Sequence, residues 1–362
     1  MNLKRKLTDT LFAPALALVI ALSLTAVILL AFGSDVGTVL NQMWSYGTRV
    51  DSIALILNLA TAYYLSAVAV AIGFKMNLFN IGVNGQYLLG AMFAAAVAGQ
   101  LNLPKLIAIP VTITVAMAVG ALWAGLAGWL KVARGVSEVI STIMLNFIAL
   151  GIVSYTIIRT DIGKDIALNV RGTKVIAESG RMPGFTLPNS NTEIYGFIWV
   201  AVLIGVGYWF LLKRTRFGFD LRATGMSPTA AVASGVDAKK ITFITMLISG
   251  AVAGLVALPD LLGSTYTYTL NFPTGFGFAG IAIALLGRNN PVGIAFGALL
   301  WGFLDVSSQQ LDLVGIPKEV VTILQGITVL AVVIAYEISR RNKLRRQQHE
   351  VGVALAKQEV AP

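Results

Sequence analysis

The chain has 362 residues, of which 56% are hydrophobic and only 12% are charged, and it carries a formal net charge of +10. Soluble globular proteins carry about 25% charged residues, so this composition excludes an ordinary soluble domain. The chain contains no cysteine, which excludes disulfides, iron–sulfur clusters and thiolate metal sites.

Long uncharged runs follow one another along the chain. A helix needs about 20 apolar residues to cross the hydrocarbon core of a bilayer. The runs that are long enough are 11–32, 53–74, 78–103, 106–130, 139–158, 194–212 and 241–259. The first of them follows Lys4, Arg5 and Lys6, but it is longer than the 7–15 residue core of a signal peptide. We therefore expect it to be a retained first span.

The region after the last of these runs is less regular. Residues 261–287 are uncharged but rich in glycine, threonine and aromatic residues, and we expect an outer loop followed by a short or re-entrant helix. The next apolar segment starts at Val292 and continues through Asp305. Together these segments predict an all-α polytopic membrane protein with about ten transmembrane helices in one membrane domain, 1–340, followed by a cytoplasmic polar tail, 341–362.

The distribution of lysine and arginine between the loops predicts the orientation. If the N-terminus is cytoplasmic, most of the 27 basic residues fall in cytoplasmic loops and in the C-terminal tail, as the positive-inside rule requires. Both termini are therefore predicted to be cytoplasmic, with an extracellular loop at 159–193 and a cytoplasmic loop at 213–240. This bias explains the net charge, and no basic face with interleaved aromatic residues points to nucleic acid.

Sequence motifs for catalysis are missing. There is no Walker A sequence, G-x-x-x-x-G-K-[ST], and the single histidine, His349, lies in the polar tail. The stretch GFGFAG (275–280) matches the dinucleotide pattern, but no strand precedes it. We interpret its glycines, like Gly250 and Gly254, as contacts between helices. The chain is therefore predicted to be no enzyme and to need neither a cofactor nor a metal.

Polar side chains within the apolar runs are mostly neutral amides, and several lie in FNIGVNGQYLLGAM (79–92). The amides along the chain are Asn58, Asn80, Asn84, Gln86, Asn146 and Gln325, of which we expect Asn80, Asn84, Gln86 and Asn146 to line the path. A charged group at membrane depth costs about 2.5–3.5 kcal/mol on insertion scales, and Asp305 is the main candidate for one. A path lined by amides suits an uncharged solute that forms hydrogen bonds. The alternative is that the amides bond to neighbouring helices.

Aromatic residues gather near the outer half of this predicted path. They are Tyr266, Tyr268, Phe272, Phe276 and Phe278. Flat rings can stack on a nucleobase, and such contacts contribute about 1–3 kcal/mol per base in other proteins. The alternative is that the rings pack against lipid or against other helices.

The long cytoplasmic loop contains a short predicted helix with clear ends. Ser227 can cap its N-terminus, Pro228 suits the first helical position, and Gly235 suits the left-handed position at the C-terminus. Its interior is small, including Ala230 and Ala231, so that it can enter a groove on a cytoplasmic partner. A surface helix that only links two spans is the alternative, and the loop alone does not decide between them.

Four stretches of the chain resemble a known family in their sequence and in their order. They are FNIGVNGQYLLGA (79–91), GVSEVISTIMLNFIA (135–149), RATGMSPTAAVASGVDAKKI (222–241) and GFGFAGIAIALLGRNNPVG (275–293). Together they resemble the permease subunits of ABC importers for branched-chain amino acids, ribose and simple sugars, and the nucleoside branch in particular. The resemblance covers residues 50–338 and implies a fold like that of type II ABC importers, with pseudo-symmetric halves.

The resemblance also implies a function and a set of partners. The chain would be a permease subunit in a bacterial cell membrane that forms the path for nucleosides. Its partners would be a second, non-identical permease, cytoplasmic ATP-binding subunits and an extracellular substrate-binding lipoprotein. Residues 227–235 would be the coupling helix that docks on the ATPase.

Two points qualify this interpretation. Asn84 stands where members of the family often have Glu, which weakens a role as an acid and leaves a hydrogen-bonding role. The alternatives to a nucleoside permease are a simple-sugar permease of the same family and an ATP-independent carrier or channel for a neutral polar solute.

Overall fold

The computed structural model describes residues 35–101, 103–168, 170–309, 311 and 320–331, together with isolated residues within 19–33 and 334–348. Most of the predicted first span, 11–32, and nearly all of the polar tail, 341–362, lie outside these residues. The chain divides into two compact units, one of residues 46–306 and one of residues 1–45 with 307–362.

The smaller unit contributes two helices to the described residues. Most of α2 (Val36–Gly47) belongs to it, and Asp35 precedes this helix. The carboxylate of Asp35 accepts hydrogen bonds from the backbone N–H (2.8 Å) and the hydroxyl (2.6 Å) of Thr38. The other helix is apolar and covers Val320–Ala331. As described, both are shorter than the roughly 20 residues that a membrane span needs.

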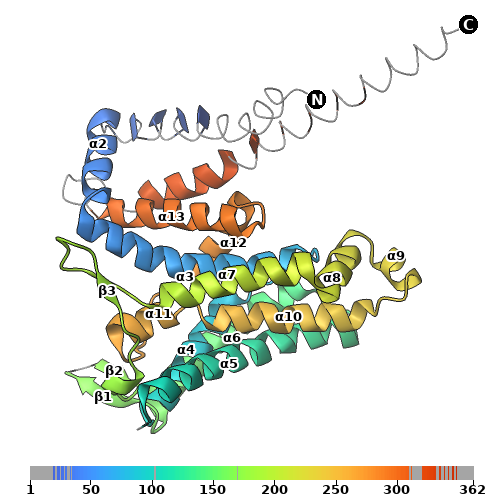
Figure 1. Ribbon diagram of the computed structural model, residues 1–362, viewed down its shortest axis with the longest axis horizontal. Helices are drawn as coiled ribbons and strands as arrows, with labels where there is room; N and C mark the ends of the chain where they lie inside the picture. The colour runs from blue at the N-terminus through green and yellow to red at the C-terminus, as the bar shows by residue number, and fades with distance from the viewer. Residues whose placement is uncertain are drawn as a thin grey trace, which may run out of the picture. The chain divides into compact units, whose positions relative to one another are not determined.

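The larger unit is built mainly from α-helices (Figure 1). They include α3 (Val50–Phe74), α4 (Val83–Ala98), α5 (Lys105–Arg134), α6 (Glu138–Arg159), α7 (Phe197–Arg214), α10 (Ala238–Gly254), α12 (Phe276–Leu286) and α13 (Pro291–Ser308). Within the described part of the chain, six helices are long and apolar enough to cross a membrane, and shorter apolar helices accompany them. The predicted mostly helical, polytopic membrane protein is confirmed, and the number of ten crossings stays a prediction.

Helix α3 lies at the centre of the larger unit. Its sequence is apolar on all sides, which is typical of a helix that is buried all round, and it packs against α12, α10 and α7. Because it is enclosed by protein, its polar side chains find partners there. The amide of Asn58 donates to the carbonyl of Glu193 (2.8 Å), and the hydroxyl of Thr61 donates to the carbonyl of Leu57 (2.7 Å).

Helices α5 and α10 are held together by small residues. A Cβ atom on Gly250 would clash with the Cβ of Ala124 and with the backbone of Gly120, and one on Gly254 would clash with the carbonyl of Ala116. No side chain fits at either position while the helices keep this distance. The predicted role of Gly250 and Gly254 as contacts between helices is confirmed.

The segment 159–193 contains short strands, so the expectation of an all-α protein was incomplete. One antiparallel hairpin joins β1 (Lys164–Ala167) to β2 (Val170–Gly172), and another joins β3 (Phe185–Thr186) to β4 (Glu193–Ile194). Both lie at one end of the helices of the larger unit (Figure 1). Strands this short give no reliable alternating pattern in the sequence, because they are held by contacts made elsewhere.

Hydrogen bonds join this segment to residues 262–268 and to the start of α3. The backbone N–H groups of Thr173, Ile176 and Met182 donate to carbonyls of residues 268, 266 and 262, at 2.9, 2.8 and 2.9 Å. The carboxylate of Asp51, in the first turn of α3, accepts from the hydroxyl of Ser190 (2.7 Å) and from two backbone N–H groups beside it. These bonds hold residues 159–193 in place at the ends of the helices, and we call this segment the cover.

The region 261–287 is more helical than expected at its start. Helix α10 continues after a turn through α11 (Leu258–Asp260) into the π-helical η2 (Leu261–Thr265), where an outer loop was predicted. The predicted short helix is present as α12, whose 11 residues span about 16 Å. That is about half of the hydrocarbon core, so α12 alone cannot cross the membrane.

Candidate functional site

Two of the predicted amides pair with each other in the interior of the larger unit. The connection between α3 and α4 is irregular, and it includes Asn80, whose side chain is 1% exposed. The amide groups of Asn80 and Gln86 exchange two hydrogen bonds (2.9 and 2.8 Å), and the Asn80 nitrogen also lies 2.9 Å from the hydroxyl of Ser249 on α10. These amides are satisfied within the protein, as the alternative interpretation expected.

A third predicted amide fixes the start of α4. Asn146 on α6 accepts a hydrogen bond from the backbone N–H of Gly85 (2.8 Å) and donates one to the carbonyl of Ile81 (2.9 Å). A Cβ atom on Gly85 would lie 2.9 Å from the Cβ of Ala149. Glycine therefore allows α6 to approach α4 closely enough for Asn146 to reach its backbone.

Asn84 joins the start of α4 to the start of α12. Its side-chain oxygen accepts a hydrogen bond from the backbone N–H of Gly277 (2.9 Å), in the first turn of α12. The side chain is half-buried, unlike those of Asn80 and Gln86. A carboxamide oxygen is a suitable acceptor here, because the first N–H groups of a helix have no partner within the helix.

The start of α12 lies deep within the helical unit. The hydroxyl of Ser66 on α3 donates to the carbonyl of Phe276 (2.7 Å). Ser66 lies eight residues before the end of α3 at Phe74, or about 12 Å along the helix. Helices that begin within the membrane direct the positive ends of their dipoles into it.

Phe276 and Phe272, two of the predicted aromatic residues, are packed inside the larger unit. The ring of Phe276 makes edge contacts with Tyr63 (5.2 Å between centroids) and Tyr87 (5.9 Å). The ring of Phe272 stacks on Tyr268 at 5.0 Å, and these two side chains are 4% and 2% exposed. Both phenylalanines therefore already have aromatic partners within the chain.

Phe278 differs from the other predicted aromatic residues, because its side chain is 58% exposed. It belongs to the first turn of α12, one residue after the Gly277 that Asn84 caps. At the start of α12, Asn84 thus caps Gly277 and the next side chain, Phe278, is exposed, whereas the rings of Phe272 and Phe276 are buried.

Sequence reasoning missed several residues that complete this arrangement. The hydroxyl of Tyr63 donates to the carboxylate of Asp305, and that of Tyr87 donates to the carbonyl of Pro273 (3.1 Å). Ser249 also holds the backbone of α3, through a 2.7 Å hydrogen bond to Ala69. Serine and tyrosine within apolar runs were the available signal, but the sequence does not tell which partner they meet.

The predicted cytoplasmic helix is present as α9 (Pro228–Ala233), which follows α8 (Arg216–Met226). The hydroxyl of Ser227 accepts from the backbone N–H of Ala230 (3.3 Å), Pro228 is the first helical residue, and Gly235 has a φ of 84°. Ala230 is exposed, whereas Ala231 is only 4% exposed and faces the chain itself. Of the two small residues, Ala230 is the one available to a partner.

Comparison with known proteins identifies the family. Residues 52–333 match the family described as branched-chain amino acid transport system / permease component. The chain belongs to this family of permease components. The match covers nearly all of the larger unit, including the junction of α4 and α12, and it agrees with the resemblance found in the sequence.

Several ABC transporter permease proteins are similar to this permease over most of its length. The guanosine ABC transporter permease protein NupP of Bacillus subtilis is 36% identical, over 91% of this chain and 94% of its own. The nucleoside ABC transporter permease protein NupB of Lactococcus lactis is 31% identical, over 91% and 93%. The glucose ABC transporter permease protein TsgB13 of Haloferax volcanii is 29% identical, over 88% and 85%. The same Bacillus has a second similar guanosine permease protein.

Proposed function

We propose that this permease is the membrane-spanning subunit of an ATP-driven importer and forms the translocation path for nucleosides. The observation that carries the proposal is the 36% identity to a guanosine permease across nearly the whole of both chains. The geometry agrees with it, because the junction of α4 and α12 offers a neutral amide and an exposed aromatic ring. Those are groups that suit an uncharged solute carrying a flat, hydrogen-bonding base.

The proposed assembly contains further subunits. A second permease, non-identical to this one, would complete the channel, and the presence of two similar guanosine permease proteins in one Bacillus supports this. Cytoplasmic ATP-binding subunits would dock on α9, and an extracellular lipoprotein would deliver the solute to the cover formed by 159–193. In this proposal both termini are cytoplasmic, the chain crosses the bacterial cell membrane ten times within 1–340, and residues 341–362 form a cytoplasmic tail.

Uptake measurements test the proposed substrate. Cells that lack this chain should lose uptake of labelled guanosine down to the background of the assay, and the intact gene should restore it. Unlabelled nucleosides should compete, while glucose should not. Competition by glucose alone would favour the sugar permease that the 29% identity to a glucose permease allows. Uptake that persists when the cells are depleted of ATP would favour an independent carrier.

Substitutions at Asn80 and Asn84 test which of the two residues lies on the translocation path and which only stabilises the packing of the helices. Asn80→Ala removes the partner of Gln86 and Ser249 and leaves buried polar groups unpaired, which typically costs about 1–3 kcal/mol each. We expect it to lower the melting temperature of the purified protein while uptake per folded molecule stays normal. Asn84→Ala should instead lower uptake per folded molecule several-fold, since its half-buried amide is proposed to meet the solute.

Melting in detergent and uptake normalised to folded protein give the two readouts. Asn84→Gln, which keeps an amide, should recover part of the uptake. Normal uptake by Asn84→Ala would remove this residue from the proposed path.

A further inference from the structure

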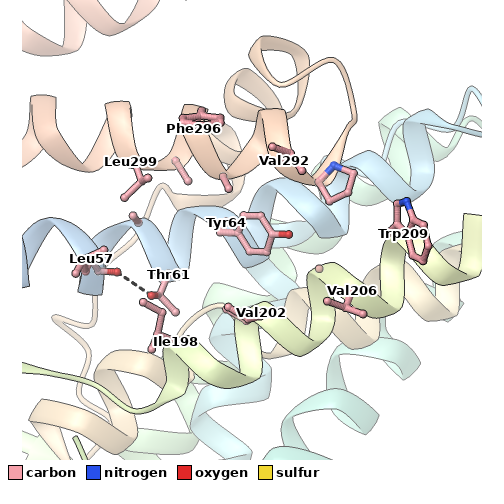
Figure 2. Close-up of a pocket in the computed structure, with 16 residues that line it drawn as sticks. Leu57, Thr61, Tyr64, Ile198, Val202, Val206, Trp209, Val292, Phe296 and Leu299 are labelled. Carbon is pink, nitrogen blue, oxygen red and sulfur yellow. Dashed lines mark hydrogen bonds between the residues drawn. The ribbon is translucent and has the colours of Figure 1, made fainter. Parts of the chain in front are cut away.

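An open apolar groove of about 570 Å³ runs between α3, α7 and α13 in the larger unit. Figure 2 shows its labelled residues, with α3 between the two other helices and Trp209 at one end. The hydroxyl of Thr61 in the groove already donates to the carbonyl of Leu57 (2.7 Å). The groove therefore offers an occupant mainly hydrocarbon surface.

The groove has the length of one lipid chain. Its α7 wall runs from Ile198 to Trp209, which is about 16 Å at 1.5 Å per residue. That length is about half of the hydrocarbon core, or one leaflet. Large side chains on its walls remain open to the surroundings, since Val206 is 57% and Phe296 is 70% exposed.

Basic residues stand where the groove ends at Trp209. Lys213 follows on the same helix one turn later, and Arg288 lies three residues before Pro291, a lining residue at the start of α13. The turn that carries Arg288 is fixed, because the hydroxyl of Tyr208 on α7 donates to the carbonyl of Asn289 (2.9 Å). Arg288 and Asn289 both adopt positive φ, 54° and 52°, a conformation that is uncommon outside glycine.

Two more cations complete a basic cluster, which we define as Lys75, Lys213, Arg222 and Arg288. Lys75 follows the last residue of α3, and α8 passes over it, so that a Cβ atom on Gly225 would lie 2.7 Å from the carbonyl oxygen of Lys75. Burial lowers the pKa of Lys75, and the positive charges of Arg222, Arg288 and Lys213 lower it further. The positive charges of Arg222, Arg288 and Lys213 thus act against that of Lys75, and an anion bound beside Lys75 would relieve that repulsion.

We propose that the groove and the basic cluster together bind one anionic phospholipid. One acyl chain would lie along α7, and the phosphate would lie at the basic cluster. Basic pockets between membrane helices are known to hold anionic headgroups, and here the cations stand directly at the end of a lipid-sized apolar groove. The inference is independent of which solute the permease carries.

Lipid titration of the purified, delipidated full-length chain tests the proposal. Palmitoyl-oleoyl phosphatidylglycerol and the matching phosphatidylcholine are added separately in a neutral detergent, and binding is followed by native mass spectrometry. Basic residues favour an anionic lipid over a zwitterionic one, so the phosphatidylglycerol should bind at least about tenfold more tightly. Inorganic phosphate should not displace it. Equal binding of the two lipids, or displacement by phosphate, would overturn the proposal.

Variants of the basic cluster and of the groove test where the lipid binds. The double variant Lys213→Ala/Arg288→Ala should weaken phosphatidylglycerol binding about tenfold or more. Its control is the double variant Lys239→Ala/Lys240→Ala, which removes the same charge at the start of α10 and should not weaken binding. Val206→Trp fills the groove and should weaken binding of the lipid. Leu122→Trp, on an exposed part of α5 outside the groove, is its control.

If a variant and its control lose lipid binding to the same extent, the proposed site is wrong. If the double variant of the basic cluster is not recovered folded, the Val206→Trp comparison decides. A photoreactive amino acid at Val206 gives an independent readout in native membranes. Coupling to a polypeptide, such as a second permease, in place of lipid would also overturn the proposal.

Discussion

Ala230→Trp is expected to abolish nucleoside uptake while the amount of permease in the membrane stays normal. Ala230 is exposed on α9, so a larger side chain there disturbs no packing within the chain. If α9 inserts into a groove on the ATP-binding subunit, the indole overfills that groove, at a typical cost of 1–3 kcal/mol. That cost weakens the association about fivefold to more than a hundredfold. Copurification of the ATP-binding subunit and uptake in the same cells measure both effects.

The control for this prediction is the same substitution at Ala133. This residue is exposed in the last turn of α5, on the proposed cytoplasmic side but away from α9. Ala231→Trp is less informative, because Ala231 is packed against its own chain and the variant would lose folded protein. Wild-type uptake and copurification with Trp at 230 would make α9 a simple linker.

Two substitutions of Gly235, just after the end of α9, give a related prediction. Gly235 has a φ of 84° and no atom within 4 Å of a Cβ built on it, so a substitution there meets backbone strain but no clash. Valine resists this conformation, while asparagine tolerates it. Gly235→Val should therefore lower uptake strongly, and Gly235→Asn much less.

Gly250→Ala is expected to reduce the yield of folded permease sharply, although it adds a single methyl group. The new Cβ atom would clash with Ala124 and with the backbone of Gly120 on α5. The α5–α10 pair must then separate or shift, and overpacking of this kind costs about 1–3 kcal/mol or more. The melting temperature of the purified protein and the fraction recovered as a single species on size exclusion measure the loss.

Gly207→Ala is the matched control for Gly250→Ala. Gly207 lies within α7 and has no atom within 4 Å of a Cβ built on it. Alanine favours helix over glycine by about 1 kcal/mol in soluble hosts, so this variant should be as stable as the parent protein. Equal melting temperatures for the two variants would mean that α5 and α10 are not closely packed in the membrane.

The sequence was sufficient for the features that depend on local chemistry. The apolar runs predicted most of the membrane helices, because lipid requires long uncharged segments. Ser227, Pro228 and Gly235 predicted both ends of α9, because caps are formed by residues a few positions apart. Gly250 and Gly254 predicted a close helix contact, since small residues are what such contacts need.

Features that depend on distant partners could not be predicted in the same way. Asn80 bonds to Ser249, which is 169 residues away, and nothing near Asn80 distinguishes that partner from a solute. Asn84 bonds to Gly277, which is 193 residues away, and this contact depends on how α12 packs against the other helices. The short strands likewise have distant partners, since Gly172 of β2 pairs with Thr269 and the carbonyl of Glu193 in β4 accepts from Asn58 on α3.

The cover formed by residues 159–193 has a mechanical consequence. It is joined to residues 262–268 by main-chain hydrogen bonds from Thr173, Ile176 and Met182, with no slack linker at those points. Tyr268, in the bonded stretch, stacks on Phe272, four residues before α12 begins. A protein that presses or pulls on the cover would therefore transmit force to the segment leading into α12 through short, stiff connections.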